Sequence, residues 1–330
     1  MHAIIHTLVD LACVTSVYFA VGDHIDLAVA SLFILGYDFL AFAMQPFLGA
    51  LASQEGWWGV ISSAGCVMVA IGTALASIPL LCILLCGLGN AAFHVGGGVV
   101  ALRHRPGEAK YVGLYVAPGA FGLFFGTIFG KWGTVSPFIF TGIMALCAIT
   151  LMIFGRPTLR KAEPRPQPKR FFLVLSLLFM TVVARALVGT YLPFKWKETF
   201  LPGLILVGFV ALGKGLGGIL GDRFGLKRVG VLALLISAPL LMIGIHTPAV
   251  GMVGALFFNC SMALTVTALA MILPGFEGVG FGLTTLALYC GVFPSFFGIF
   301  EFMHAWYIVL PLILLSALMY YLGMKGLEER

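Results

Sequence analysis

The chain has 330 residues, of which 61% are hydrophobic and only 10% charged, and its mean hydropathy is +1.08. Soluble domains carry about 25% charged residues, so this composition excludes an ordinary soluble enzyme and predicts an all-α protein with many membrane crossings. The formal charge of +6 requires no nucleic-acid partner, because most bases lie between apolar runs, where they suit a membrane surface.

The apolar runs predict twelve transmembrane helices, at about 20 residues for each crossing. They cover residues 3–21, 27–53, 57–77, 78–102, 110–130, 134–155, 171–193, 199–221, 228–246, 248–274, 278–299 and 303–324. The break at residues 156–170 contains four prolines and six bases and predicts a solvated linker. We therefore expect one six-helix bundle at 1–155 and a second at 171–330.

The first span carries two ionisable residues, His6 and Asp10, one helical turn apart. Such groups are costly at membrane depth unless they are paired or face water. An imidazole and a carboxylate at this spacing can share a proton, which predicts a proton relay; the alternative is a pair that only fixes the helix start. With Cys13 and Asp38 they also form an alternative ligand set for a metal ion or another cation.

The second and fourth spans add further polar residues. Asp38 lies near the middle of its span, which predicts a proton or cation site or a partner for a base on another helix. Gln45 follows on the same face and is a predicted substrate contact. Asn90 and His94 lie one turn apart in a glycine-rich stretch; they predict either a substrate contact or a buried pair at a close helix crossing.

The second half supplies bases at membrane depth. Arg185 lies near the middle of the seventh span, and Lys214 lies about two turns inside the eighth. A guanidinium fork suits carboxylate, phosphate or phosphonate groups, and an ammonium acts as a point charge. Both are predicted to bind substrate. The alternatives are counter-ions for Asp10, Asp38 or Glu301, or a Lys214 that only reaches toward the membrane surface.

A glycine-rich helix end followed by a charged turn joins the eighth and ninth spans, with the pattern G-x-L-x-D-R-x-G-x-K-R from Gly218 to Arg228. Asp222 is placed to meet a neighbouring helix end, while Arg223 and Arg228 hold the turn in the aqueous layer. With Gly225, these residues resemble the loop signature of the major facilitator superfamily of secondary transporters. The resemblance implies a gating role for them and a major-facilitator-type fold.

The two halves also repeat each other. A shift of 169 residues places Gly49 on Gly218, Ser53 on Asp222 and Gln45 on Lys214. Chance similarity between glycine-rich helices is the alternative. The repeat predicts two pseudo-symmetric bundles around a cavity at the membrane midplane.

Shorter motifs resemble narrower groups within the superfamily. Pro118 and Gly119 weakly resemble the fifth-helix signature of its antiporters, which implies a kinked, flexing helix. Three first-half patterns are similar to the fosmidomycin-resistance efflux branch: His6-x-x-x-Asp10, Gln45-Pro46-x-x-Gly49 and the run from Gly89 to His94. The chain departs from that branch where Val95 follows His94 and where Ser53 and Gln54 replace an Asp-Arg pair. The resemblance implies export.

The bases are distributed unequally between the two sides. The loops and tail on the linker side carry 14 of them, whereas the opposite side carries three, Lys131, Lys195 and Lys197. The positive-inside rule places both termini and the linker in the cytoplasm, and we expect a multi-pass protein of the plasma or inner membrane.

No hydrolase, nucleotide-binding or metalloprotease motif is present in the sequence, so we expect no enzyme activity and no cofactor. The combined hypothesis is a monomeric transporter that works by alternating access. It exchanges protons at His6, Asp10 or Asp38 for a small anionic or zwitterionic molecule. Two alternatives are a metal-ion or cation transporter and a non-transporting membrane sensor.

Overall fold

The computed structural model describes residues 1–22, 25–155, 159, 166–299 and 305–329. These residues form helices joined by short turns, with no strand among them. Within them, eleven helices are apolar and long enough to cross a membrane, and α8 (Ile139–Phe154) adds a shorter apolar helix of 16 residues. The predicted all-α fold with twelve apolar helices is confirmed.

Most crossings are single helices. They are α1 (His2–Val21), α4 (Trp57–Ala74), α5 (Pro79–His104), α8, α9 (Phe171–Tyr191), α10 (Phe200–Phe224), α11 (Leu226–Gly244), α12 (Pro248–Ile272) and α14 (Trp306–Glu328). A short 3-10 turn, η2 (Lys195–Glu198), lies between α9 and α10.

Three crossings are interrupted. The second crossing consists of α2 (Leu27–Asp38), a π-helical turn η1 (Phe39–Ala43) and α3 (Gln45–Ala52). The fifth consists of α6 (Lys110–Val116) and α7 (Gly119–Trp132). The eleventh consists of α13 (Glu277–Val292) and the 3-10 turn η3 (Phe293–Phe297). Pro118 lies between α6 and α7, and a proline interrupts a helix because it lacks an N–H group. The fifth crossing is therefore interrupted at the position where a kink is predicted.

Part of the predicted linker, residues 156–158 and 160–165, lies outside the described residues, as does the start of the last predicted span at 303–304. Leu159 and residues 166–168 have no regular secondary structure. The domain boundaries at 155 and 171 stay predictions.

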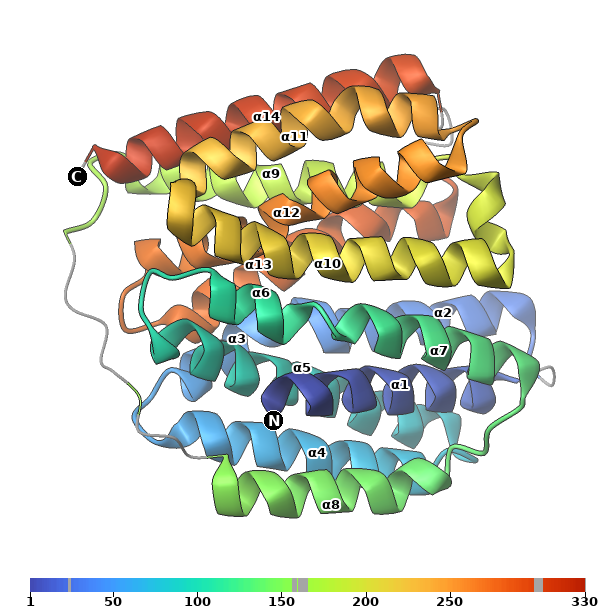
Figure 1. Ribbon diagram of the computed structural model, residues 1–330. Helices are drawn as coiled ribbons and strands as arrows, with labels where there is room; N and C mark the ends of the chain where they lie inside the picture. Colours follow the sequence, from blue (N-terminus) through green and yellow to red (C-terminus); the bar gives the residue numbers. More distant parts are fainter. Residues whose placement is uncertain (23–24, 156–158, 160–165, 300–304, 330) are drawn as a thin grey trace.

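The helices form two groups that lie side by side (Figure 1). The helices from α1 to α8, in blue to green, form one group, and those from α9 to α14, in yellow-green to red, form the other. Between the groups, α13 packs on η1, α3 and α5, while α10 packs on α6 and α7. The repeat relates these two sets of contacts to each other: one joins the second crossing to the eleventh, and the other joins the fifth to the eighth.

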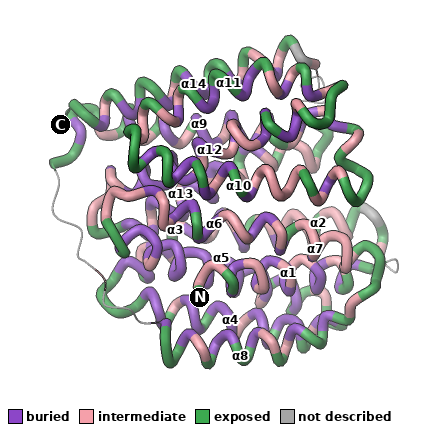
Figure 2. Tube along the Cα trace, in the orientation of Figure 1, coloured by how far each residue is buried: buried purple, intermediate pink, exposed green. Residues whose placement is uncertain are grey.

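Burial follows this arrangement (Figure 2). The outer faces expose large apolar side chains such as Phe47, Phe154 and Phe172, which suits contact with lipid. The polar side chains that are buried, including Asp10, His94 and Arg185, lie inside, where helices can satisfy them.

Candidate functional site

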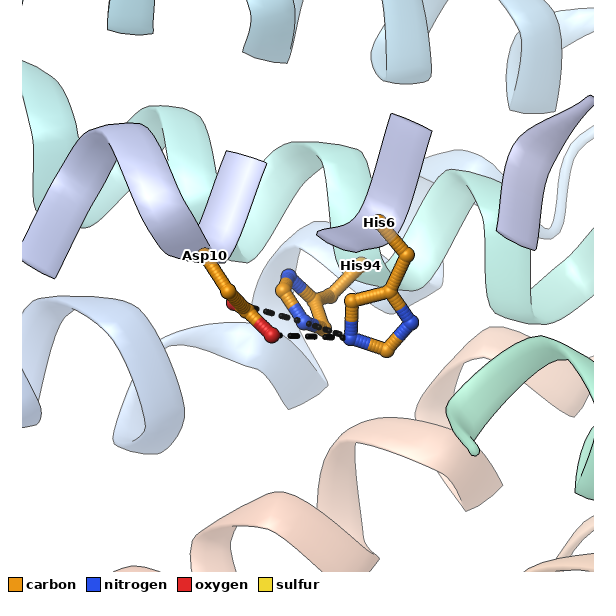
Figure 3. Close-up of side chains that lie close together, drawn as sticks. All are labelled: His6, Asp10 and His94. Carbon is orange, nitrogen blue, oxygen red and sulfur yellow. Dashed lines mark hydrogen bonds and ion pairs between the residues drawn. The ribbon is translucent and has the colours of Figure 1, made fainter. Parts of the chain in front are cut away.

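Three ionisable side chains of the first half meet at one point (Figure 3). His6 and Asp10 come from α1, and His94 comes from α5. The Asp10 carboxylate lies 3.2 Å from His6 Nε2 through Oδ2 and 3.5 Å from His94 Nε2 through Oδ1. The two Nε2 atoms lie 2.7 Å apart, and all three residues are buried.

Neighbouring groups fix the orientation of these side chains. His6 Nδ1 lies 2.8 Å from the Tyr115 carbonyl oxygen, and His94 Nδ1 lies 2.8 Å from the Asn90 carbonyl oxygen. The Asn90 amide donates to Asp10 Oδ1 at 3.1 Å. A carbonyl can only accept, so each imidazole carries a proton on Nδ1.

That tautomer leaves the two Nε2 atoms facing each other. If both rings were neutral, two lone pairs would meet at 2.7 Å, which is repulsive. A proton held between the rings would make the contact attractive, and the adjacent Asp10 carboxylate would compensate for its charge.

Gly119 at the start of α7 makes room for the group. A Cβ atom there would lie 2.5 Å from His6 Nε2 and 2.8 Å from Asp10 Oδ2. Glycine at this position therefore lets the α7 backbone approach the two side chains that α1 contributes.

The group lines a cavity of about 110 Å³ between the two halves. His6, Asp10 and His94 belong to its first-half wall, and Lys214 of α10 belongs to its second-half wall. Thr284 and Thr285 of α13 also line it. Ionisable side chains of the first half and a base of the second therefore line one space between the halves.

A larger cavity of about 390 Å³ adjoins the first, and the two share Lys214, Met262 and Leu288 as lining residues. Arg185 and Asn259 also line it, and it reaches Lys197 in the connection between α9 and α10, at the end opposite the linker.

Arg185 is buried without an acidic partner among the described residues. Its Nη2 atom donates to the Phe258 carbonyl oxygen at 3.4 Å, and its guanidinium lies over the Phe258 ring at 5.3 Å. Its Nε atom has no hydrogen-bond partner in the described part of the chain.

Lys214 likewise forms no ion pair or hydrogen bond with a described residue. Neither base is therefore a contacting counter-ion of Asp10 or Asp38 in this structure. Glu301, the third acid considered for that role, lies outside the described residues.

Two predicted site residues lie elsewhere. Asp38 ends α2 and is half-buried, and it lines neither cavity. Gln45 donates to the Ala41 carbonyl oxygen at 2.7 Å, and its backbone packs against Gly282. It also lines neither cavity, and its substrate contact stays a prediction.

The alternative metal set of His6, Asp10, Cys13 and Asp38 is not assembled either. Cys13 donates to the Cys86 carbonyl oxygen at 3.6 Å and lies outside the group. The group that could hold a metal ion consists of His6, Asp10 and His94 within the described residues, so the helical spacing on α1 identified two of its three members.

The predicted gating residues between Gly218 and Arg228 lie at the linker end, where the halves are in contact. Asp222 accepts hydrogen bonds from the backbone N–H groups of Ala109 at 2.6 Å and Lys110 at 3.0 Å. These groups belong to the start of α6, so the predicted meeting of Asp222 with a neighbouring helix end is confirmed. Ser53 accepts from the Gly278 N–H at 2.9 Å at the equivalent place in the other half.

The glycines at this end repeat the same symmetry. Gly49 packs against the Gly278 backbone, and a Cβ on Gly218 would lie 2.5 Å from the Ala109 carbonyl oxygen. Gly225 has a φ of 93° in the turn after α10, where glycine is favoured.

Arg223 and Arg228 are exposed in this turn. The Arg223 guanidinium lies over the Phe224 ring. The predicted surface position of both bases agrees with this exposure.

Sequence reasoning missed a buried ion pair that also joins the halves. Arg103 at the end of α5 donates to Glu277 Oε2 through Nη2 at 2.7 Å and Nε at 2.9 Å. Arg103 Nη2 also donates to the Ser53 carbonyl oxygen at 2.7 Å. The signal in the sequence is a base in the last turn of one apolar run and an acid at the start of another.

No protein-family model matches the sequence, and no curated protein matches it. Solved structures of major facilitator superfamily transporters match the whole fold. FucP in its outward conformation has a TM-score of 0.64 at 12% identity, covering 99% of this chain and 98% of its own. A variant of the E. coli fucose:proton symporter FucP has a TM-score of 0.62 at 13% identity, with the same coverage.

The human organic anion transporter MFSD10 (TETRAN) has a TM-score of 0.67 at 11% identity and 99% coverage of both chains. At these identities the likeness establishes the fold, so the major-facilitator-type fold predicted from the loop signature and the repeat is confirmed. The narrower resemblance to the fosmidomycin-resistance branch stays a prediction.

Proposed function

We propose that this protein is a proton-coupled secondary transporter of a small organic molecule and works by alternating access between the bundles at 1–155 and 171–330. The observation that carries the proposal is the contact between His6 and His94 on the wall of the cavity between the halves, which a shared proton would make attractive. A proton held where substrate and both halves meet can couple its own release to a rearrangement of the halves.

The arrangement of cavities supports a state closed toward the linker. The contacts of Asp222 and of Arg103 with the opposite half close that end. The larger cavity extends from Lys214 to the opposite end. One of the matched structures, FucP, is described as being in the outward conformation. Because the distribution of bases predicts a cytoplasmic linker, we assign this chain to the outward state as well.

The bases in the larger cavity favour an anionic or zwitterionic substrate. Arg185 and Lys214 have no acidic partner among the described residues, and Arg185 keeps an unused Nε donor. A carboxylate, phosphate or phosphonate would satisfy both. Asn259, on the same wall, adds an amide for a polar substituent. The organic anion transporter among the matched structures adds support for this substrate class.

For direction, we propose export in exchange for protons, as the efflux-branch motifs of the first half imply. Symport is a second candidate, and the charge of the site favours it. A shared proton on His6 and His94 adds positive charge beside Lys214, which strengthens the binding of an anion. FucP, among the matched structures, is a proton symporter.

We further propose that the protein is a monomer of the plasma or inner membrane with both termini in the cytoplasm. Asp38 stays a proposed second proton site, because it is a carboxylate within a membrane span. Gln45 is proposed to contact substrate only in a state where α3 and α13 have separated.

Counterflow in liposomes tests the function and the substrate class. Purified protein is reconstituted and preloaded with each member of a panel of carboxylates, phosphonates, zwitterions, neutral solutes and cations, and uptake of the same labelled compound is measured. We expect uptake of an anion or zwitterion, lost in Arg185→Ala and in Lys214→Ala. Normal counterflow in both variants would refute the anion site, and no counterflow with any compound would refute transport.

An imposed pH gradient then gives the direction. If the substrate accumulates on the acidic side of the membrane, against its own concentration gradient, the result supports exchange for protons. Accumulation on the alkaline side supports symport.

A further inference from the structure

His6, His94 and Asp10 direct three donor groups at one point on the cavity wall, within 4.8 Å of one another. We propose that this group is also a binding site for a divalent transition-metal ion of the zinc, cobalt and nickel class. Within the described part of the chain, this is the group of His, Cys, Asp and Glu side chains whose donor atoms lie close enough together to hold one metal ion. It differs from the ligand set that the spacing on α1 predicts, because His94 replaces Cys13 and Asp38.

The donors already have the orientation that a metal ion needs. Histidines that bind metals usually donate their other ring N–H to a carbonyl or carboxylate, which fixes the tautomer and the ring plane. His6 and His94 both do so, at 2.8 Å, through the carbonyl oxygens of Tyr115 and Asn90. The Asn90 side chain fixes the Asp10 carboxylate in the same way. The bare Nε2 atoms then point at each other and at the carboxylate.

The spacing of the donors fits a small ion after one adjustment. In a tetrahedral site with metal–ligand bonds of about 2.0–2.1 Å, the ligand atoms are about 3.3 Å apart. The Asp10 oxygens lie 3.2 and 3.5 Å from the two Nε2 atoms and match this value. The Nε2 atoms, at 2.7 Å, would have to separate by about 0.6 Å to reach it. The cavity of about 110 Å³ beside them gives room for this movement and for a fourth ligand such as water.

The chemistry of the donors selects the class of ion. Two imidazoles and one carboxylate suit borderline ions, whereas magnesium and calcium prefer oxygen ligands alone and copper(I) prefers sulfur. Asp10 gives the site one negative charge. Lys214 on the facing wall opposes a cation, so removing its charge should strengthen metal binding.

A metal ion bound here would occupy the Nε2 and carboxylate atoms on the cavity wall. Metal binding itself is independent of the proposed function. Its consequence, inhibition of transport, rests on that function.

The test uses the full chain, purified with a tag that contains no histidine, and Co²⁺ as the probe. Tetrahedral coordination gives Co²⁺ a strong visible absorption, which reports ligands and geometry directly. We expect a saturable band that Zn²⁺ removes and that Mg²⁺ leaves unchanged. His94→Gln and Asp10→Asn should weaken Co²⁺ binding by about 100-fold. His104→Gln is the matched control, because His104 lies on the same helix and is exposed.

A second variant keeps the result interpretable if the ligand variants fold poorly. Lys214→Gln should bind Co²⁺ several-fold more tightly, a gain that misfolding cannot produce. Equal binding by wild type, His94→Gln and the His104→Gln control would overturn the proposal, as would the absence of a Co²⁺ band in wild type.

Transport measured with a metal chelator present separates the two proposals: transport without metal binding refutes only the metal site, and metal binding without transport refutes only the proposed function.

Discussion

The ion pair between Arg103 and Glu277 is predicted to hold the linker end closed, and Glu277→Gln removes its negative member. Arg103 is only 8% exposed, and it donates to Glu277 Oε2 at 2.7 and 2.9 Å. Breaking a buried ion pair by removing one partner costs about 3–5 kcal/mol. The carbonyl oxygens of Ser53 and Gly275 still accept from Arg103 Nη2, so we expect a loss at the lower end, about 3 kcal/mol.

The loss acts on the closed state alone, because opening separates α5 from α13 and exposes Arg103 to water. A change of about 3 kcal/mol shifts the ratio of closed to open molecules by about 100-fold. Spin labels on Gln54→Cys and Phe224→Cys report this shift, since both positions are exposed at the linker end on opposite halves. The exposed Cys290 is first replaced by alanine. Electron–electron distance measurements should show a longer-distance population in Glu277→Gln.

The matched control removes an exposed ion pair within the second half. Lys227 of α11 pairs with Glu328 of α14, and exposed pairs contribute about 0–1 kcal/mol. Glu328→Gln should therefore leave the distance distribution unchanged. If Glu277→Gln also gives the wild-type distribution, the ion pair does not hold the linker end closed and the reasoning is refuted.

Three further predictions concern the same assembly. Asp222→Asn removes the charge at the start of α6, worth about 0.5–2 kcal/mol, so the same labels should show a smaller shift to the open state; an unchanged distribution would contradict this. Gly119→Ala should abolish proton coupling, because its Cβ would lie 2.5 Å from His6 Nε2; Gly142→Ala, with no atom within 4 Å of the added Cβ, should couple normally in the same dye assay. Arg185→Lys should bind substrate about tenfold more weakly in competition uptake, because an ammonium cannot replace a bidentate fork; equal affinity would contradict a guanidinium contact.

The sequence predicts the number of crossings well, because the cost of burying backbone polar groups in lipid requires long apolar helices. It also predicts the pairing of Asp222 with a helix start, since a charged turn between two spans has few other partners at that depth. The repeat that places Ser53 on Asp222 reappears as matching hydrogen bonds to Gly278 and Ala109.

The site was predicted only in part, for a physical reason. Spacing along one helix reveals that His6 and Asp10 share a face. A polar residue on a span indicates burial, but it does not say which neighbour it meets, and the long apolar helices of this chain have no strongly polar face to orient them. The meeting of His94 with His6 and the helix contact of Gln45 therefore could not be predicted from the sequence.

The measurement that tests the central claim most directly is proton movement driven by substrate in liposomes that contain a pH-sensitive dye. Wild type, His94→Gln and Asp10→Asn are compared with His104→Gln and with Asp26→Asn, whose exposed carboxylate caps α2. We predict that substrate moves protons in wild type and in both controls, and that His94→Gln and Asp10→Asn abolish this movement. Proton movement of wild-type size in His94→Gln, or substrate flux without any proton movement in wild type, would contradict the account.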